Sequence, residues 1–432
     1  MNFYNLKHKE EQLNFKEATI KGQGKDKGLF FPEDISKFSN EFLQNLPNLS
    51  NEEIAFQVMK DFAGDEIPEA ELRKIVAETI AFDIPLKKVT ENISVLELFH
   101  GPTLAFKDVG ARFMSRCLGY FLKNETRKVT VLVATSGDTG GAVANGFYDV
   151  EGIEVVILYP KNRVSPVQEK QLTALGKNIH ALEVNGSFDD CQALVKQAFS
   201  DESLNEKLLL TSANSINVAR WLPQQIYYVL ALKQWLKNNS ENPVICVPSG
   251  NFGNICAGIL AHHRGLPVEH FIAACNVNDV VPEYLRTEIL KPKETVATIS
   301  NAMDVGDPSN FVRILELFEK EFNQVKNKLS GYTIDDEETL KTIERVEKDY
   351  GYVLDPHGAV AFVALEKYLT ENDGKGFFLE TAHPVKFPDS VEQATGKSVE
   401  IPKSLEELMK QEKFTTEINP QYEELKEFLL KK

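Results

Sequence analysis

One stretch between residues 154 and 184 limits the possible folds of this chain more than any other. It begins with the apolar run EVVILYP (154–160), which has the length of a buried strand. A helix start follows at 165–168, where Ser-Pro precedes a glutamine at the capping-box position, and Gly176 ends the helical pattern. A second apolar run, IHALEV (179–184), comes directly afterwards. A strand, a capped helix and another strand in this order predict a βαβ unit with parallel strands.

The same alternation continues along the chain. FDDCQALVKQAF (188–199) predicts the next helix, and NVARWLPQQIYYVLALKQWL (217–236) predicts a long one that bends at Pro223. PVICVPSG (243–250) and FIAACNVND (271–279) are further strand candidates. Strands that alternate with helices of this length imply an α/β fold, in which a parallel sheet carries helices on both faces.

Two segments repeat one plan. KVTVLVATSGDTGGAVANGF (128–147) and PVICVPSGNFGNICAGILAHH (243–263) each consist of an apolar strand, a Ser-Gly turn with further glycine, and a helix of small residues. We therefore expect two similar αβ lobes that meet at a cleft.

The two ends of the chain depart from this central pattern. The sequence IPEAELRKIVAETIA (67–81) places apolar side chains at helical spacing, so residues 1–90 are expected to form a small, mainly helical unit. The tail 391–432 is highly charged and is expected to form helices that pack back on the body. Between them lies the region 91–390, which holds both αβ lobes.

Charge and composition exclude several classes of function. A net charge of −16 argues against nucleic acid as a partner, because phosphate backbones are bound by basic surfaces. No apolar run approaches the roughly 18 residues of a membrane span, and no secretory leader precedes the fold. Five cysteines without a C-x-x-C pair predict buried free thiols in a reducing cytoplasm. No metal site is expected, because His262 and His263 diverge on a helix and lack a third ligand.

The sequence SGNFGN (249–254) lies where a strand ends and the helix ICAGILAHH begins. There, unpaired backbone N–H groups and the helix dipole together favour a dianionic phosphate. An ordinary strand-to-helix turn would also use glycine for its dihedral angles. Two glycines and two asparagines exceed what a turn requires, so we favour a phosphate cradle. The spacing does not match the dinucleotide fingerprint.

The loop TSGDTG (135–140) has the same placement but different chemistry. Asp138 disfavours a second phosphate by repulsion, whereas Thr135, Ser136 and Thr139 offer hydroxyl groups. The loop amides could hold a carboxylate. A helix-capping turn is the alternative, and the residues alone do not decide between the two.

Lys107 follows the turn HGPT and the apolar residues Leu-Ala-Phe. A lone lysine is usually a surface residue. At the edge of a dry pocket, however, desolvation lowers the pKa of a lysine and frees its amine as a nucleophile. A reactive amine, a phosphate cradle and a cleft together point to pyridoxal 5'-phosphate, whose aldehyde takes the lysine and whose phosphate takes the glycine loop.

Six motifs in a fixed order extend this interpretation. They are HGPTLAFKDVGARF, TSGDTGGA, FDDCQ, SANSIN-x-AR, PSGNFGN and ETAHPVKFPD. Together they resemble the threonine synthase family, in the branch found in bacteria and fungi. The resemblance implies fold type II of the pyridoxal phosphate enzymes, which is also the fold of the tryptophan synthase β subunit.

The resemblance also assigns roles by position. Lys107 is implied to form a Schiff base with the cofactor and to make most proton transfers, and Thr381 to face the pyridine nitrogen. The residues implied to surround the cofactor phosphate are Gly250, Asn251, Phe252, Gly253 and Asn254. The residues implied to grip the substrate carboxylate are Thr135, Ser136, Asp138 and Thr139.

The family reaction converts O-phospho-L-homoserine and water into L-threonine and phosphate, so the cleft needs cations for a second phosphate. The candidates are Arg112, Arg220 and Lys386, with Asn185 and Asn214 as further hydrogen-bond donors. Each cation could instead be a structural salt-bridge partner. His100, His383 and Asp108 flank the motifs and receive no firm role.

Two other functions remain open from the sequence. A serine or threonine dehydratase of the same fold would stop at elimination and would need no site for the substrate's phosphate. A protein that binds a phosphorylated ligand without catalysis is the second alternative. In each case the expected partner is a small molecule, and the sequence does not distinguish a monomer from a homodimer.

Overall fold

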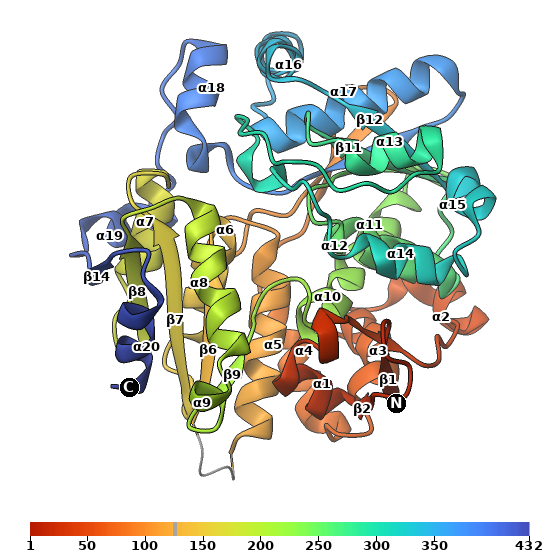
Figure 1. Cartoon of the computed structure of the whole chain (residues 1–432). Coiled ribbons are helices and arrows are strands. Elements are labelled where there is room, and N and C mark those ends of the chain that lie inside the picture. The colour runs from red at the N-terminus through yellow and green to blue at the C-terminus, as the bar shows by residue number, and fades with distance from the viewer. Residues whose placement is uncertain (124–127, 432) are drawn as a thin grey trace.

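The structure is a computed structural model that describes residues 1–123 and 128–431. Two sheets form its centre, one in each of two αβ lobes (Figure 1). The first contains β4 (Leu86–Lys88), β5 (Ile93–Glu97), β10 (Val244–Pro248), β11 (His270–Cys275), β12 (Leu329–Thr333) and β13 (Gly376–Glu380). The second contains β6 (Val129–Ala134), β7 (Ile153–Pro160), β8 (Ile179–Val184), β9 (Leu209–Thr211) and β14 (Thr415–Ile418).

Both sheets are essentially parallel. Their strand orders are β12-β11-β10-β13-β5-β4 and β14-β8-β7-β6-β9. Among the described strand pairs of these two sheets, β4 with β5 is antiparallel and the rest are parallel. The predicted α/β fold with two lobes is therefore confirmed.

The βαβ unit forms as predicted. Ser165 caps α7 (Pro166–Thr173), and the capping box with Gln168 is present. β7 and β8 then pair in parallel, with Val155 opposite Ile179. The helix ends slightly earlier than Gly176, which instead takes a φ of 66° in the turn that follows.

Helices cover both faces of the sheets. The remaining helices of the lobes are α5 (Lys107–Phe121), α6 (Asp138–Phe147), α8 (Phe188–Ser200), α9 (Glu202–Asn205), α10 (Val218–Trp221), α11 (Gln225–Trp235), α12 (Gly253–His263), α13 (Val280–Thr287), α14 (Phe311–Leu317), α15 (Phe322–Lys328), α16 (Asp336–Tyr350) and α17 (Pro356–Glu371). The predicted helix over 217–236 is divided into α10, a 3-10 turn over Leu222–Gln224 and α11, because Pro223 cannot donate a backbone hydrogen bond.

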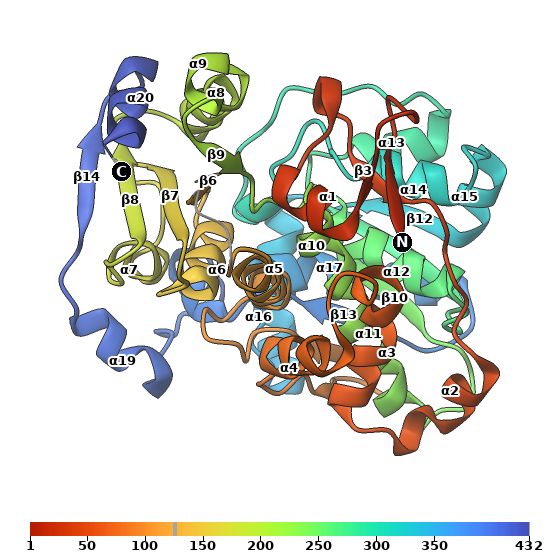
Figure 2. The same cartoon turned by 90° about the horizontal axis from the view of Figure 1, so that it is seen from below.

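The N-terminal unit is less purely helical than the sequence indicates. It contains the helices α1 (Phe15–Lys21), α2 (Asn40–Asn45), α3 (Asn51–Ala63) and α4 (Glu69–Thr79), and the strands β1 (Asn2–Asn5), β2 (Gln12–Asn14) and β3 (Phe30–Pro32). α4 confirms the helix predicted in 67–81, whereas the small antiparallel sheet was not predicted. Figure 2 shows this unit against α5 and α10, and its Phe15 packs against Phe113 of α5.

The tail packs back on the body, as expected, but it is not only helical. It forms α18 (Pro388–Thr395), α19 (Lys403–Lys410), β14 and α20 (Tyr422–Leu430). β14 adds an edge strand parallel to β8, and Leu425 and Leu429 of α20 are buried beneath it.

Three smaller findings bear on function. All five cysteines are free and buried, as predicted. None of the helices in the described part of the chain is both long and apolar enough to cross a membrane. Over the same residues, no group of three or more His, Cys, Asp or Glu side chains could hold a metal ion.

Candidate active site

A large cavity lies between the lobes, at the carboxyl ends of their parallel strands. Its volume is about 1560 Å³, and residues of the N-terminal unit also line it. The site residues expected from the sequence that line this cavity are Lys107, Thr135, Ser136, Asp138, Thr139, Asn214, Arg220, Gly250, Asn251, Phe252, Gly253, Asn254 and Thr381. Ligand sites of open α/β sheets typically lie at this end of the strands.

The turn before Lys107 is built to place that residue first in α5. Asp108 accepts hydrogen bonds from the Thr103 backbone N–H at 2.9 Å and from its Oγ1 at 2.6 Å. A side chain at Gly101 would come within 2.4 Å of the Asp108 carboxylate, so glycine is required there. Leu104, which lies in this turn between Gly101 and Asp108, adopts a positive φ of 56°. Asp108, which had no role from the sequence, is therefore the residue that fixes this turn.

The amine of Lys107 is largely withdrawn from water. Its side chain is 17% exposed, and its Nζ lies 5.2 Å from the ring centre of Phe106 and 3.7 Å from Asp138 Oδ2. Burial lowers the pKa of Lys107 below its ordinary value, and the negative charge of Asp138 opposes that shift only in part. A buried amine with a lowered pKa has the character that a nucleophilic lysine requires.

The loop from β10 to α12 forms the opposite wall of the cavity. Among the described residues, no side-chain cap is formed at the N-terminus of α12, and Phe252 precedes the helix with a positive φ of 60°. A side chain at Gly250 would lie 2.6 Å from Met303 Cα, so only glycine lets the two backbones approach this closely. This is the geometry of a phosphate cradle, in which backbone N–H groups meet the positive end of a helix.

Asn251 and Asn254 serve this loop in different ways. Asn251 ties it to neighbouring segments, since its Nδ2 donates to Ser215 Oγ at 2.8 Å and its Oδ1 accepts from the Ser309 N–H at 2.7 Å. Asn254 Oδ1 accepts from the hydroxyl groups of Tyr227 and Tyr228, both at 2.7 Å. Its buried Nδ2 has no partner among the described residues and is left to donate to a ligand.

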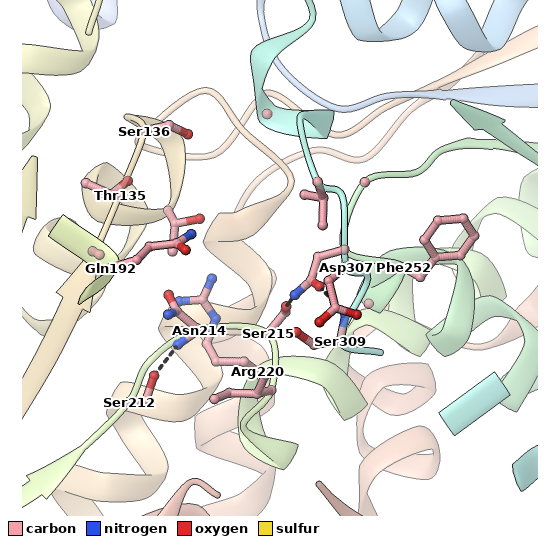
Figure 3. Close-up of a pocket in the computed structure, with 18 of the residues that line it drawn as sticks. Thr135, Ser136, Gln192, Ser212, Asn214, Ser215, Arg220, Phe252, Asp307 and Ser309 are labelled. Atoms are coloured by element: carbon pink, nitrogen blue, oxygen red, sulfur yellow. Dashed lines mark hydrogen bonds between the residues drawn. The ribbon is translucent and has the colours of Figure 1, made fainter. Parts of the chain in front are cut away.

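Arg220 lies at the centre of the cavity (Figure 3), between Thr135 and Ser136 on one side and Phe252 and Ser309 on the other. It is only 4% exposed, and its Nε and Nη1 have no hydrogen-bond partner in the described part of the chain. Burial lowers the pKa of Arg220 to about 10, so the guanidinium is still charged at neutral pH. An unpaired buried cation in a cavity is a ready site for an anionic group.

The loop over 135–140 stabilises its own turn and also lines the cavity. Thr135 Oγ1 accepts from the backbone N–H groups of Gly137 and Gly140, both at 2.9 Å, so this hydroxyl is used by the turn itself. Ser136 and Thr139 line the cavity. Figure 3 shows Ser136 and Thr135 on the same wall.

Besides Asp108, five residues considered from the sequence do not line the cavity. Arg112 donates to the Glu78 carbonyl oxygen at 3.0 and 2.7 Å, and Asn185 donates to Glu417 Oε1 at 2.8 Å. Lys386 is fully buried against Asp138. The other two are His100, which contacts Glu97 Oε2 at 2.6 Å, and His383, whose pKa is lowered by burial to about 4.

Several residues at or next to the cavity were not expected from the sequence. Tyr227 and Tyr228 orient Asn254, Gln168 binds Asp138, and Ser215 holds the cradle. None of them stands in a glycine-rich loop or in a charged pattern. Their roles depend on partners in other segments, so neither the motif that contains Ser215 nor the capping box that contains Gln168 indicates these contacts.

The sequence of the whole chain is similar to those of known proteins. Family models match residues 2–80 (threonine synthase N terminus), 83–376 (pyridoxal-phosphate dependent enzyme) and 358–429 (threonine synthase, C-terminal). A threonine synthase of Haemophilus influenzae is 46% identical, with both chains covered completely. The chain belongs to the threonine synthase family. It is thus a pyridoxal phosphate-dependent enzyme of threonine biosynthesis, and the predicted family is confirmed.

Solved structures agree with the threonine synthase assignment. The threonine synthase of Escherichia coli superposes with a TM-score of 0.93 at 44% identity, with complete coverage of both chains. A pyridoxal phosphate-bound threonine synthase of Brucella melitensis gives 0.92 at 35% identity, covering 99% of this chain and 98% of that one. A tomato threonine deaminase reaches only 0.57 at 14% identity, covering 85% of this chain and 96% of its own, which shows a shared fold alone.

The residues of the cavity fit the cofactor of this family. A desolvated amine at Lys107, an uncapped helix N-terminus behind Gly250, and the unpartnered Nδ2 of Asn254 are the groups that an aldehyde and a phosphate need. Thr381 lines the same cavity, and its carbonyl oxygen accepts from the Phe106 N–H at 2.9 Å, beside the lysine turn.

Proposed function

We propose that the cavity converts O-phospho-L-homoserine and water into L-threonine and phosphate. The observation that carries this proposal is that the cavity offers two separate places for phosphate. One is the loop 249–254 at the start of α12, and the other is the unpaired guanidinium of Arg220. A dehydratase substrate has no phosphate, so once its carboxylate is held by the loop over 135–140, no anionic group is left to pair with Arg220.

Each part of the cavity has a task in this proposal. Bound pyridoxal phosphate supplies an electron sink that stabilises negative charge on the substrate carbon atoms. Asn254 Nδ2 and the backbone of the loop would hold the cofactor phosphate, and the hydroxyl of Thr381, which lines the same cavity, would be the partner of the ring nitrogen. Lys107 Nζ, in its neutral form, takes the proton from the substrate Cα and later one from Cβ. Loss of the γ-phosphate, addition of the water hydroxyl at Cβ, and return of the two protons to Cγ and Cα then give threonine, while the remaining proton of the water leaves with the phosphate.

The substrate anions are held by opposite walls of the cavity. We assign the γ-phosphate to Arg220, with Asn214 beside it, because a dianion needs a charged donor. The carboxylate belongs to the loop of Ser136 and Thr139, whose hydroxyl groups line the cavity. Arg112 and Asn185 are left out of this assignment, because other residues occupy them.

We also propose where the enzyme works, which partners it lacks and how the chain divides into regions. An acidic chain with five free thiols fits a cytoplasmic enzyme that has no nucleic-acid partner. We propose that the chain divides into three regions, 1–90, 91–390 and 391–432. The family models that end at 80 and begin at 83 support a boundary close to the first of these.

Product analysis tests the reaction. The purified enzyme with pyridoxal phosphate should release phosphate and threonine in equal amounts from O-phosphohomoserine. Lys107→Ala should abolish both products, whereas Lys74→Ala, which removes an exposed lysine, should leave turnover unchanged. Formation of 2-oxobutanoate from threonine, without threonine synthesis, would identify a dehydratase instead.

A further inference from the structure

Lys386 is a second buried lysine beside Lys107, yet it does not line the cavity. It ends the 3-10 helix Pro384–Lys386 that follows β13, and it is fully buried. Its Nζ donates to Asp138 Oδ1 at 2.7 Å and to the Thr103 carbonyl oxygen at 2.9 Å. An ammonium group held in this way is not available to a substrate phosphate, so its place next to the reactive lysine needs another explanation.

The two oxygens of Asp138 have different partners. Oδ1 accepts from Lys386 and also from Gln168 Nε2 at 3.0 Å, whereas Oδ2 faces Lys107 Nζ at 3.7 Å. The second distance is longer than a hydrogen bond. Burial alone would raise the pKa of Asp138, but the charges of Lys386 and Lys107 hold it well below its ordinary value. Asp138 is therefore an anion whose charge is taken up mainly by Lys386.

The charge balance of this cluster depends on the proton of Lys107. When Lys107 is neutral, Asp138 and Lys386 compensate each other. When Lys107 is protonated, one positive charge is left over, and the nearby Arg220 adds another. Uncompensated charge in a buried site is unfavourable. Without Lys386, in contrast, the nearest cation left for Asp138 would be Lys107 itself.

The cluster also links the two lobes to each other. Asp138 begins α6 of the five-stranded lobe, whereas Lys386 follows β13 of the six-stranded lobe. Lys386 is further anchored to Thr103, which Asp108 fixes in the turn that carries Lys107. The charged groups that act on the Lys107 amine thus come from three elements, namely Asp138 of α6, Arg220 of α10 and Lys386.

We propose that Asp138 and Lys386 are positioning residues for Lys107. Asp138 orients the amine, and Lys386 takes up the charge of Asp138 so that the amine can release its proton. The proposal rests on the assignment of Lys107 as the reactive amine of the proposed function.

The two substitutions should shift the titration of Lys107 in opposite directions. In Lys386→Met, Asp138 has only Lys107 to pair with, so the midpoint should rise by about 1 pH unit. In Asp138→Asn, the anion that favours the protonated amine is gone, so the midpoint should fall by about 1 pH unit. Lys386→Arg keeps the charge and should stay near the wild-type value.

The titration can be read without turnover. The full-length protein, freed of pyridoxal phosphate, is treated with trace acetic anhydride across a pH series, and acetylation of Lys107 is measured by peptide mass spectrometry. The exposed Lys74 of the same molecule is the internal standard. Lys328→Met is the control variant, because Lys328 also donates to two backbone carbonyls but lies outside the cavity lining. It should not move the midpoint.

A second measurement uses the holoenzyme. In the plot of kcat against pH, the acidic limb should shift to higher pH in Lys386→Met and to lower pH in Asp138→Asn. KM for O-phosphohomoserine should change little. A large rise in KM for Lys386→Met without a shifted limb would show instead that Lys386 binds substrate, and it would overturn the proposal.

Other outcomes would also refute the proposed positioning role of Asp138 and Lys386. Shifts of both variants in one direction, or no shift in Asp138→Asn, contradict the charge balance argued above. If Lys386→Met does not fold, Asp138→Asn and Lys386→Arg still decide the question. Failure to form threonine would overturn the proposed reaction but would leave the acetylation midpoints unchanged, so the two failures can be told apart.

Discussion

Replacing Arg220 by methionine should lower activity and raise stability at the same time. Arg220 is buried, and two of its nitrogen atoms have no partner in the described part of the chain. In the protein without substrate, its charge therefore opposes folding. In the proposed complex with substrate, the same nitrogen atoms would bind the substrate phosphate. A neutral side chain of similar length removes both effects.

Both magnitudes follow from the structure. Burial lowers the pKa of Arg220 to about 10, and at 1.36 kcal/mol per pH unit the difference from its ordinary value corresponds to about 3 kcal/mol of opposed folding. Because methionine packs less well beside Gly110, the net gain in unfolding free energy should be about 1–3 kcal/mol. Two hydrogen bonds to a charged group contribute about 1.5–3 kcal/mol each, so kcat/KM should fall roughly 10²–10⁴-fold.

Urea unfolding and steady-state kinetics measure the two effects, and Arg264→Met is the matched control. Arg264 is equally buried, and burial lowers its pKa to the same value of about 10. Its guanidinium, however, donates to Val58 O at 2.7 Å and to Asp61 Oδ2 at 2.7 Å. Arg264→Met should therefore destabilise the protein. If Arg220→Met destabilises it equally, or leaves kcat/KM intact, the reasoning about Arg220 is wrong.

Three further variants test other parts of the structure. Gly250→Ala places a methyl group 2.6 Å from Met303 Cα, so pyridoxal phosphate affinity, followed by absorbance titration, should fall about tenfold or more. Burial, reinforced by the charge of Asp355, raises the pKa of Glu380 well above its ordinary value. The contribution of protonated Glu380 to the free energy of unfolding is therefore fully present below the pKa that this group has in the unfolded chain. It is lost as the pH rises towards the higher pKa of the folded state. Glu380→Gln should remove this pH dependence of the free energy of unfolding, measured by urea titration at acid and neutral pH. A variant that keeps the pH dependence of the wild type would contradict this role of Glu380. Leu425→Ala, in the buried face of α20, should cost about 2–5 kcal/mol without changing KM.

The parts of the fold that could be predicted are those with local signals. The βαβ unit has a cap, a first-turn proline and two apolar runs within 154–184, and the structure reproduces it. β14 and the strands of the N-terminal sheet have only three or four residues, too few to show a period of two. Each is stabilised by a distant partner, as β14 is by β8, so no local pattern could have revealed it.

The same distinction applies to the cations of the site. Arg112, Arg220 and Lys386 are basic residues in or beside recognisable motifs, and the sequence gives no reason to separate them. Their partners do separate them, because a backbone carbonyl occupies Arg112, a carboxylate 248 positions away occupies Lys386, and Arg220 Nε and Nη1 have none among the described residues. Since a buried guanidinium without partners opposes folding, a chain that retains one must gain from its binding a ligand. The unsatisfied charge, rather than the motif, is thus the reason for proposing Arg220 as the cation that receives the substrate.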